Sequence, residues 1–345
     1  MSRITVLGAV NSYTGYGLHT IQAVRDIETL SGAYVSVRAL STSEAFGARI
    51  PMDIRRRFVN GPQPEPWELL IHPPNFLPTP GKKTAYFSMW EATRLPPKGR
   101  SLLNKATVVF TPSHWNASTF SACGVDVPIE VVPLGINTKA FYYRPPPQRL
   151  DGLCVFGAAG RMAHGGVRKG INEVIEAFLA AFPKQDDARL RIKCWPDCPV
   201  AKVRDNRISI TAAYLSDDEV AEWFSGIHVF VSAARAEGWG LMQHQAMAVG
   251  RPIITVDFGG VREFFKPAMG YALPYRMVQA TKAYDGCGHW AEPDFDDFVS
   301  MMRHVYERRE QAQEKGRAAA VAMMGTDWLD ANRVLVSKLM KLGAL

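Results

Sequence analysis

The chain has 345 residues, of which 47% are hydrophobic and 21% are charged. This length suits two domains rather than one core, and the composition is that of a folded protein, which excludes a disordered or collagen-like chain. The formal net charge of +7 lies in the first part: residues 1–150 hold 16 Lys and Arg against 9 Asp and Glu, whereas residues 151–345 hold 24 basic and 24 acidic residues.

Other compositional features bear on the compartment and on partners. No run of about 20 apolar residues, the length of a membrane-spanning helix, occurs in the sequence. The first residues run directly into a strand-like segment and lack the pattern of a signal peptide. The five cysteines are scattered, which suits a reducing compartment and favours neither disulfides nor a metal site. We therefore expect a cytoplasmic protein, monomeric or homodimeric, and its basic first part favours an anionic partner such as DNA or the inner face of a membrane.

Short apolar runs alternate with helical patterns along the whole chain, which is typical of β-α-β units in parallel sheets. Strands are expected in the first part at residues 4–7, 34–39, 69–71, 84–87, 108–111 and 129–132. In the second part they are expected at residues 153–158, 189–194, 207–210, 228–231, 252–256 and 270–273.

The proline run at residues 145–147 forbids a helix and predicts an extended connection. The predicted organisation is an N-terminal Rossmann-like domain at 1–145, a second one at 146–325 and a C-terminal helix at 326–345. Ligands of open α/β sheets bind beyond the carboxyl ends of the strands, so we expect the site in a cleft between the two domains.

The loop after the first expected strand carries Gly15 and Gly17 just before a helix that is expected to begin near Leu18. Glycines at such a junction let the main chain approach a ligand, and a helix N-terminus favours an anion. The spacing is not the dinucleotide fingerprint G-x-G-x-x-G, so a nicotinamide cofactor is not expected. A plain tight turn remains the alternative for this loop.

The first strand of the second part leads to Arg161, and a glycine-rich loop then leads to Lys169 before a helix expected at residues 171–182. A guanidinium and an ammonium that flank a loop at a helix N-terminus can bind a diphosphate. Surface charge is the alternative for either residue taken alone. The pair together favours phosphate binding.

Glu237 follows another strand and comes just before Gly238, Trp239, Gly240 and Leu241, where a further helix begins. A carboxylate before such a turn can accept hydrogen bonds from sugar hydroxyls, while amides of the turn face an anion. Gln245 lies two helical turns further on, so its amide can point into the same site. The alternative for Glu237 is a helix cap, although a cap does not require the glycines.

These motifs resemble those of the retaining GT-B glycosyltransferases, in the large nucleotide-sugar-dependent family that includes sucrose synthases and bacterial mannosyl- and glucosyltransferases. The resemblance rests on Gly160-Arg161, Lys169-Gly170, residues 213–219, Glu237 to Leu241, Gly250-Arg251-Pro252 and Gly259-Gly260. One position departs from the family, because Gln245 stands where a second glutamate usually holds the donor ribose.

The resemblance implies two Rossmann-like domains facing each other across a cleft, with the C-terminal helix returning to the N-terminal domain. It implies transfer of a sugar, with retention, from a nucleotide-diphospho-sugar such as a UDP- or GDP-sugar, without a metal or other cofactor. The implied donor-binding residues are Gly15, Gly17, Arg161, Lys169, Leu215, Glu237, Gly238, Trp239, Gly240, Leu241 and Gln245. Glu237 is implied to be catalytic as well.

Acceptor chemistry is expected from residues that follow two strands of the first domain. Glu91 can orient or deprotonate an acceptor hydroxyl, His114 can contact the sugar or a phosphate, and Trp90 and Ser113 lie beside them in sequence. A buried, hydrogen-bonded glutamate and a helix-starting histidine are the structural alternatives. The acceptor itself stays open between an anionic lipid, a glycan or protein, and DNA with a hydroxylated base.

Two other functions fit the same sequence. Loss of the second glutamate at Gln245 is compatible with a protein that binds sugar nucleotides without turning them over. A nucleotide-sugar epimerase of the same architecture needs the donor and no acceptor, and product analysis would reveal it.

Overall fold

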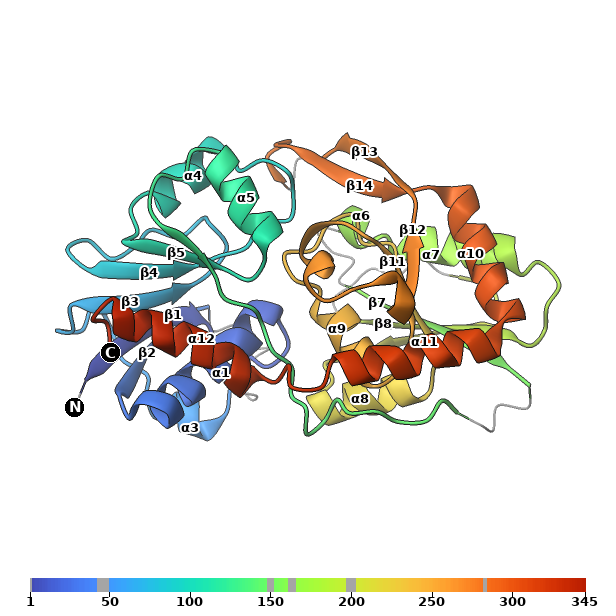
Figure 1. Cartoon of the computed structure of the whole chain (residues 1–345), viewed down its shortest axis with the longest axis horizontal. Coiled ribbons are helices and arrows are strands. Elements are labelled where there is room, and N and C mark those ends of the chain that lie inside the picture. The colour runs from blue at the N-terminus through green and yellow to red at the C-terminus, as the bar shows by residue number, and fades with distance from the viewer. Residues whose placement is uncertain (1, 42–49, 148–151, 161–165, 197–202, 282–283) are drawn as a thin grey trace. The chain divides into compact units, whose positions relative to one another are not determined.

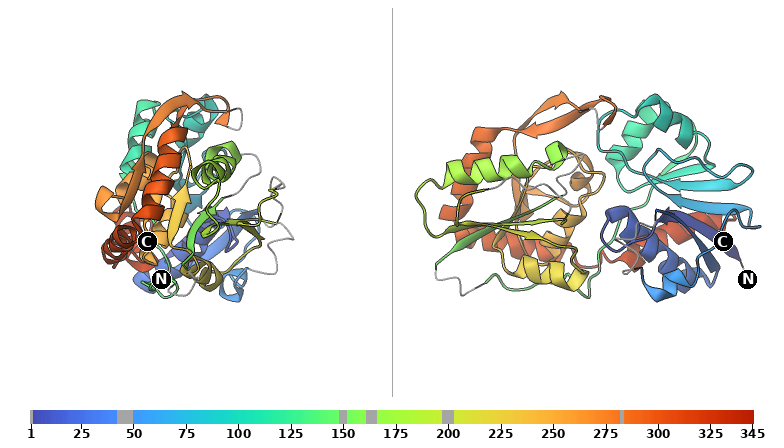
Figure 2. Two further views of the ribbon diagram at one scale, coloured as in Figure 1. Left: turned by 90° about the vertical axis from the view of Figure 1, so that its right-hand side faces the viewer. Right: turned by 180° about the vertical axis from the view of Figure 1, so that it is seen from behind.

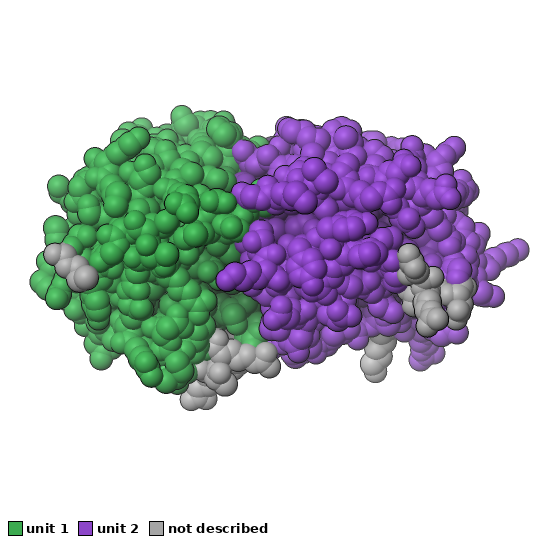
Figure 3. All heavy atoms as spheres, turned by 60° about the horizontal axis from the view of Figure 1, so that its bottom comes forward, with its two compact units in different colours: residues 1–135, 326–345 green, residues 136–325 purple. Residues whose placement is uncertain are grey.

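The computed structural model describes residues 2–41, 50–147, 152–160, 166–196, 203–281 and 284–345. The chain divides into two compact units, which Figure 3 distinguishes by colour. Unit 1 comprises residues 1–135 and 326–345, and unit 2 comprises residues 136–325.

Unit 1 is built on a parallel sheet whose described strands run in the order β2-β1-β3-β4-β5-β6 (Figure 1). The strands are β1 (Arg3–Ala9), β2 (Tyr34–Ser41), β3 (Trp67–Ile71), β4 (Lys83–Phe87), β5 (Val108–Thr111) and β6 (Ile129–Val131). The helices are α1 (Gly15–Ser31), α3 (Met52–Arg55), α4 (Pro97–Leu103), α5 (His114–Ala122) and α12 (Trp328–Lys341). Strands β3 and β5 are buried along their whole length, as parallel strands covered on both faces must be.

Unit 2 repeats this arrangement with the strand order β12-β11-β10-β7-β8-β9, and helices cover both faces of its sheet (Figure 2). The strands are β7 (Cys154–Ala159), β8 (Ala188–Cys194), β9 (Ile208–Ala212), β10 (Val229–Ser232), β11 (Ile253–Val256) and β12 (Gly270–Leu273). The helices are α6 (Gly166–Lys169), α7 (Ile171–Ala181), α8 (Asp217–Ser225), α9 (Leu241–Ala248), α10 (Phe295–Glu307) and α11 (Arg309–Ala322). Two 3-10 turns, η1 (Gly259–Glu263) and η2 (Pro267–Met269), complete the unit.

The sequence predicted the strands of both sheets correctly, with ends displaced by at most two residues. It did not predict the antiparallel pair β13 (Tyr275–Gln279) and β14 (His289–Pro293), which lies outside the parallel sheets. The side chains of β13 are almost all exposed, so this strand lacks the apolar run that marked the others.

The C-terminal helix α12 packs on unit 1, as the family resemblance implied (Figure 1). The ring of Trp328 at its start stacks on His19 of α1, with centroids 5.7 Å apart. Further along, Asn332 Nδ2 donates a hydrogen bond to Asp26 Oδ2 at 2.7 Å. The last segment of the chain therefore completes the unit that the first segment begins.

The boundary between the units lies at residue 135 rather than at the expected residue 145. Arg251, which is fully buried in unit 2, holds the chain at the proline run. Its Nε donates to the carbonyl of Phe224 at 2.9 Å, and its Nη2 donates to the carbonyls of Arg144 at 2.9 Å and Pro145 at 3.1 Å. The segment before the proline run is thus bound to unit 2 and is not a free spacer.

Candidate functional site

Glu237 and two cations form a buried charged cluster in unit 2, at the carboxyl ends of the neighbouring strands β7 and β10. Glu237 lies between β10 and α9, and only 7% of it is exposed. Lys169, at the end of α6, pairs through Nζ with Glu237 Oε1, and Arg168 Nη1 lies 3.1 Å from Glu237 Oε2. Arg168 also donates to the carbonyl of Ala236 at 2.6 Å.

The two cations control the charge of Glu237. Burial by itself raises the pKa of this carboxyl, but Lys169 and Arg168 outweigh burial and hold the pKa below its ordinary value. The carboxylate therefore stays ionised at neutral pH and is outnumbered by the two positive charges beside it. An anion with more charge than a carboxylate, such as a diphosphate, can compete for the same cations.

Two glycines allow the main chain to approach this cluster. Gly170, between α6 and α7, has a φ of +64°, and a Cβ there would lie 2.6 Å from the carbonyl oxygen of Ala233. The amide of Gly260 donates to the carbonyl of Glu237 at 2.8 Å, and a Cβ on Gly260 would lie 2.0 Å from the carbonyl oxygen of Gly238. Any side chain at either position would displace the loop that carries the charges.

The amino end of α9 adds a second feature that suits an anion. Its N-cap is Gly240, with a φ of +105°, and no side chain of the described residues caps the helix. The amides around Leu241 therefore lie at the positive end of a helix. Since Gly240 is three residues from Glu237, the helix start and the charged cluster belong to one loop.

Trp239 and Gln245 are both buried. The indole Nε1 of Trp239 donates to His244 Nδ1 at 3.1 Å, and the His244 ring stacks on Phe264 at 4.9 Å. Burial lowers the pKa of His244 to about 3, so this histidine is neutral at pH 7 and can accept the bond. The side chain of Trp239 is thus engaged with the core of unit 2, while Gln245 lies on α9.

Of the predicted pair of cations, the structure places Lys169 against Glu237, whereas Arg161 lies outside the described residues. Arg168, which we did not select from the sequence, is the second cation in the described part of the cluster. Its guanidinium also lies over the ring of Tyr284, 6.0 Å from the centroid. The only feature of the sequence that could have indicated Arg168 is that it is a basic residue directly before Lys169.

The loop expected to meet a nucleobase follows β9 and contains Leu215, which is half-buried. Ser216 and Glu219 form a reciprocal cap at the start of α8, in which the Ser216 amide donates to Glu219 Oε2 at 2.7 Å. Asn137 Nδ2 donates to Asp217 Oδ2 at 3.0 Å and ties this loop to the segment that enters unit 2. The loop is therefore held in place just after Leu215.

In unit 1, the glycine loop forms the start of α1, which begins at Gly15 rather than near Leu18. The side chain of Asn11 accepts the amides of Tyr13 and Thr14, at 3.1 and 2.8 Å. A Cβ on Gly17 would lie 2.3 Å from the carbonyl oxygen of Asn11, so the close approach requires a glycine there. Gly15 is exposed at the helix start.

The segment with Trp90 and Glu91 follows β4 and is held by the half-buried Tyr16 and the buried Asn116, neither of which we predicted from the sequence. The hydroxyl of Tyr16 accepts the amide of Met89 at 2.9 Å, and Asn116 Oδ1 accepts the amide of Trp90 at 2.7 Å. Burial and, secondly, the charge of Glu91 raise the pKa of Tyr16 well above its ordinary value. Glu91 is half-buried, and its charge interacts electrostatically with the Tyr16 hydroxyl.

Ser113 and His114 lie where β5 leads into α5, and they differ in accessibility. Ser113 is fully buried and is the N-cap of α5, because its hydroxyl accepts the amide of Asn116 at 3.2 Å. His114 is exposed in the first turn of the same helix. The structure therefore gives Ser113 a capping role and leaves the His114 side chain at the surface.

Two paired carboxylates on a short motif can bind a divalent cation, and Asp294-Phe295-Asp296 has this form. In the structure, Asp294 is the N-cap of α10, and its Oδ1 accepts the amides of Asp296 and Asp297 at 3.0 and 3.1 Å.

No group of three or more His, Cys, Asp or Glu within the described ranges is arranged to hold a metal ion. Nor does any described helix combine the length and apolar character needed to cross a membrane.

Residues 154–283 match the family described as Glycosyl transferases group 1. One relative is the lipopolysaccharide core biosynthesis mannosyltransferase LpsB of Rhizobium meliloti (strain 1021). It is 28% identical over 161 residues, which cover 41% of this chain and 44% of that protein. The chain thus spans about half the length or less of the curated relatives it matches.

Solved structures resemble the whole chain. Sucrose-phosphate synthase from Thermosynechococcus elongatus has a TM-score of 0.75 at 14% identity, with all of both chains covered. Alr3699/HepE of Anabaena, solved in complex with UDP-glucose, has a TM-score of 0.70 at 14% identity, with 99% of this chain and 100% of that chain covered.

Two parallel α/β units, with a charged loop at the strand ends of the second, define the GT-B fold class. Residues 154–283, which lie in unit 2, are similar to the glycosyl transferases group 1 family.

Proposed function

We propose that the protein is a retaining glycosyltransferase that moves a sugar from a nucleotide-diphospho-sugar to the hydroxyl group of an acceptor. The cluster of Glu237 with Lys169 and Arg168 near the start of α9 is the observation that carries this proposal. The complex of the Anabaena protein with UDP-glucose supports a UDP-sugar donor, and a GDP-sugar remains the other candidate.

The cluster suits the difficult step of the reaction, in which the bond from the anomeric carbon to the diphosphate breaks. Negative charge then grows on the leaving group, where Lys169, Arg168 and the amides near Leu241 would stabilise it. Arg161 is expected to add a third cation. Glu237, freed from its cations by the diphosphate, would accept hydrogen bonds from the donor sugar. Because these groups neutralise the leaving group themselves, we propose that no metal is needed.

On the acceptor side, the hydroxyl oxygen forms its bond to the anomeric carbon on the face that the diphosphate leaves. Its proton passes to the departing diphosphate, which accounts for retention without a covalent enzyme intermediate. We assign Glu91 and Trp90 to binding and orientation of the acceptor, because Tyr16 and Asn116 hold the main chain of this segment at Met89 and Trp90. His114 is exposed and is assigned to the outer part of the acceptor.

The acceptor is proposed to carry negative charge. Part of the basic excess is used inside unit 1, since Arg57 pairs with Glu28 and Lys82 donates to main-chain carbonyls. Arg100 and Lys105, however, line an open hollow of about 540 Å³ on this unit. The resemblance to a lipopolysaccharide core mannosyltransferase favours an anionic lipid over DNA.

The donor proposal is tested by a thermal-shift panel of nucleoside diphosphates and their sugars. A ligand that binds only the native state raises the melting temperature with the logarithm of its concentration. We expect one nucleotide series to do so, followed by transfer or slow hydrolysis of its sugar. Binding without any turnover would favour a non-catalytic protein, and no binding across the panel would contradict the proposal.

The acceptor proposal is tested by binding to anionic liposomes and to duplex DNA, each across a salt series. We expect binding to liposomes that weakens steeply as salt screens the basic hollow, and less binding to DNA. Replacement of Arg100 by glutamate should weaken the binding to anionic liposomes further. Salt-sensitive binding to DNA alone would replace the lipid with a nucleic acid acceptor, and binding to neither would indicate a neutral glycan or a protein.

A further inference from the structure

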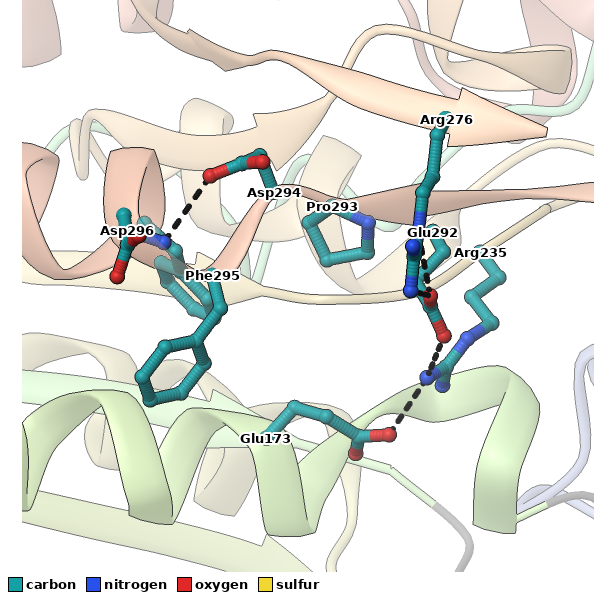
Figure 4. Close-up of a pocket in the computed structure, with 9 residues that line it drawn as sticks. Glu173, Arg235, Arg276, Glu292, Pro293, Asp294, Phe295 and Asp296 are labelled. Carbon is teal, nitrogen blue, oxygen red and sulfur yellow. Dashed lines mark hydrogen bonds and ion pairs between the residues drawn. The ribbon is translucent and has the colours of Figure 1, made fainter. Parts of the chain in front are cut away.

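Arg235 links three elements around the charged cluster without being one of its cations. It lies two residues before Glu237, and 5% of it is exposed. Its Nη2 donates to Glu173 Oε1 on α7 at 2.7 Å and to Glu292 Oε1 on β14 at 2.9 Å, as Figure 4 shows. Its Nη1 donates to the carbonyl of Val167 on α6.

The main chain of Arg235 holds the same region. Its amide donates to the carbonyl of Arg168 at 2.8 Å, and its carbonyl accepts the amide of Ala291 at 3.0 Å. Both Val167 and Arg168 are therefore fixed by one residue, through its side chain and its main chain. Helix α6 spans residues 166–169 only, and a helix of one turn has little stability of its own.

We propose that Arg235 is a positioning residue that holds the 166–169 turn where Arg168 and Lys169 can meet a diphosphate; this rests on the proposed function. Arg235 makes its contacts on the side of the turn that faces α7 and β14, whereas Arg168 and Lys169 direct their charges to Glu237. Loss of the guanidinium would free the turn and misplace both charges, although it removes neither.

The chemistry of arginine suits this role. Burial lowers its pKa, but hydrogen bonds to Glu173 and Glu292 outweigh this and hold the pKa above the ordinary value, so the charge is permanent. Its planar fork serves two carboxylates and a carbonyl at once, which the single ammonium of a lysine cannot reproduce at the same distances. Arg235→Lys therefore keeps the charge and loses the geometry.

The same network supplies a matched control. Arg276 donates to Glu292 Oε2 at 2.7 and 3.0 Å, yet its side chain is 79% exposed. Both arginines line a cavity of about 290 Å³, shown in Figure 4, and only Arg235 reaches α6. Arg276→Ala thus disturbs Glu292 and spares the turn.

The experiment measures calorimetric affinities of wild type, Arg235→Lys and Arg276→Ala for UDP, GDP and the nucleosides uridine and guanosine. A misplacement of about 1 Å in a binding group is costly, so we expect Arg235→Lys to bind the preferred diphosphate about tenfold more weakly. Its affinity for the matching nucleoside should be unchanged, and Arg276→Ala should resemble wild type for both ligands. A weaker affinity for the diphosphate with an unchanged affinity for the nucleoside indicates a defect in binding of the phosphates.

Equal diphosphate affinity in Arg235→Lys and wild type would overturn the inference and leave the proposed function intact. A parallel loss of nucleoside and diphosphate affinity would also overturn it, because Arg235 would then support the unit as a whole. Wild type that binds no diphosphate would instead overturn the proposed function. If Arg235→Lys does not fold, Glu292→Gln keeps Arg235 paired with Glu173 and should show the same divergence, at about threefold.

Discussion

Replacement of Lys169 by alanine is expected to lower kcat/KM for the sugar donor by two to three orders of magnitude, or about 3–4 kcal/mol of transition-state stabilisation. Lys169 is the ammonium closest to Glu237, and the departing diphosphate gains charge as its bond to the sugar breaks. The loss should fall mainly on kcat, because the interaction strengthens as that charge develops. Steady-state kinetics with the donor identified by the thermal-shift panel will measure it.

Lys184→Ala is the matched control, because Lys184 is an exposed lysine of the same unit. Its kinetics should stay within about twofold of wild type, as for most surface substitutions. Lys169→Arg should recover part of the lost rate, since it restores the charge with a different shape. Turnover of Lys169→Ala close to that of wild type would exclude this ammonium from the chemical step.

Replacement of Arg251 by leucine is expected to lower the free energy of unfolding by about 3 kcal/mol. The substitution removes the donor from the carbonyls of Phe224, Arg144 and Pro145, of which the bond to Phe224 is buried. The loss is smaller than three separate bonds imply, because leucine also removes the cost of burying a charge. That cost is visible in the pKa of Arg251, which burial lowers to about 10.

Chemical denaturation at pH 7 will measure this effect, with Arg262→Leu as control. Arg262 donates to the carbonyl of Asp257 at 2.9 Å, but its side chain is 50% exposed, so water can replace it. We expect less than about 1 kcal/mol for the control. If Arg251→Leu and the control have the same free energy of unfolding, the hydrogen bonds of Arg251 to the proline segment do not contribute to stability.

The parallel sheets were predictable because their strands are short apolar runs between helical segments. Strand β5, with the sequence Val-Val-Phe-Thr, is buried at every position and has the predicted limits. The pair β13 and β14 escaped prediction, because a mostly exposed strand carries no such pattern. The expected boundary at residue 145 differs from the one at residue 135 for a related reason. Prolines indicate an extended segment, but they do not indicate which unit that segment packs against.

The charged cluster was predictable in part. Lys169 stands next to Gly170, and Glu237 stands three residues before Gly240; both glycines have a positive φ, which favours glycine in the sequence. Arg235 carries no such mark, since its partners Glu173 and Glu292 lie 62 and 57 residues away along the chain. Tyr16 and Asn116 escaped selection because their contacts are with main-chain atoms of the distant segment after β4.

The place of α12 in unit 1 affects when each unit can fold during synthesis. Unit 2 is continuous in sequence, so all of its residues are available before synthesis ends. Unit 1 needs α12, which is translated after all of unit 2, and until then the face of α1 with His19 and Asp26 lacks its contacts with Trp328 and Asn332. The N-terminal unit therefore cannot complete its packing until α12 has been synthesised, although domains generally fold in order of synthesis.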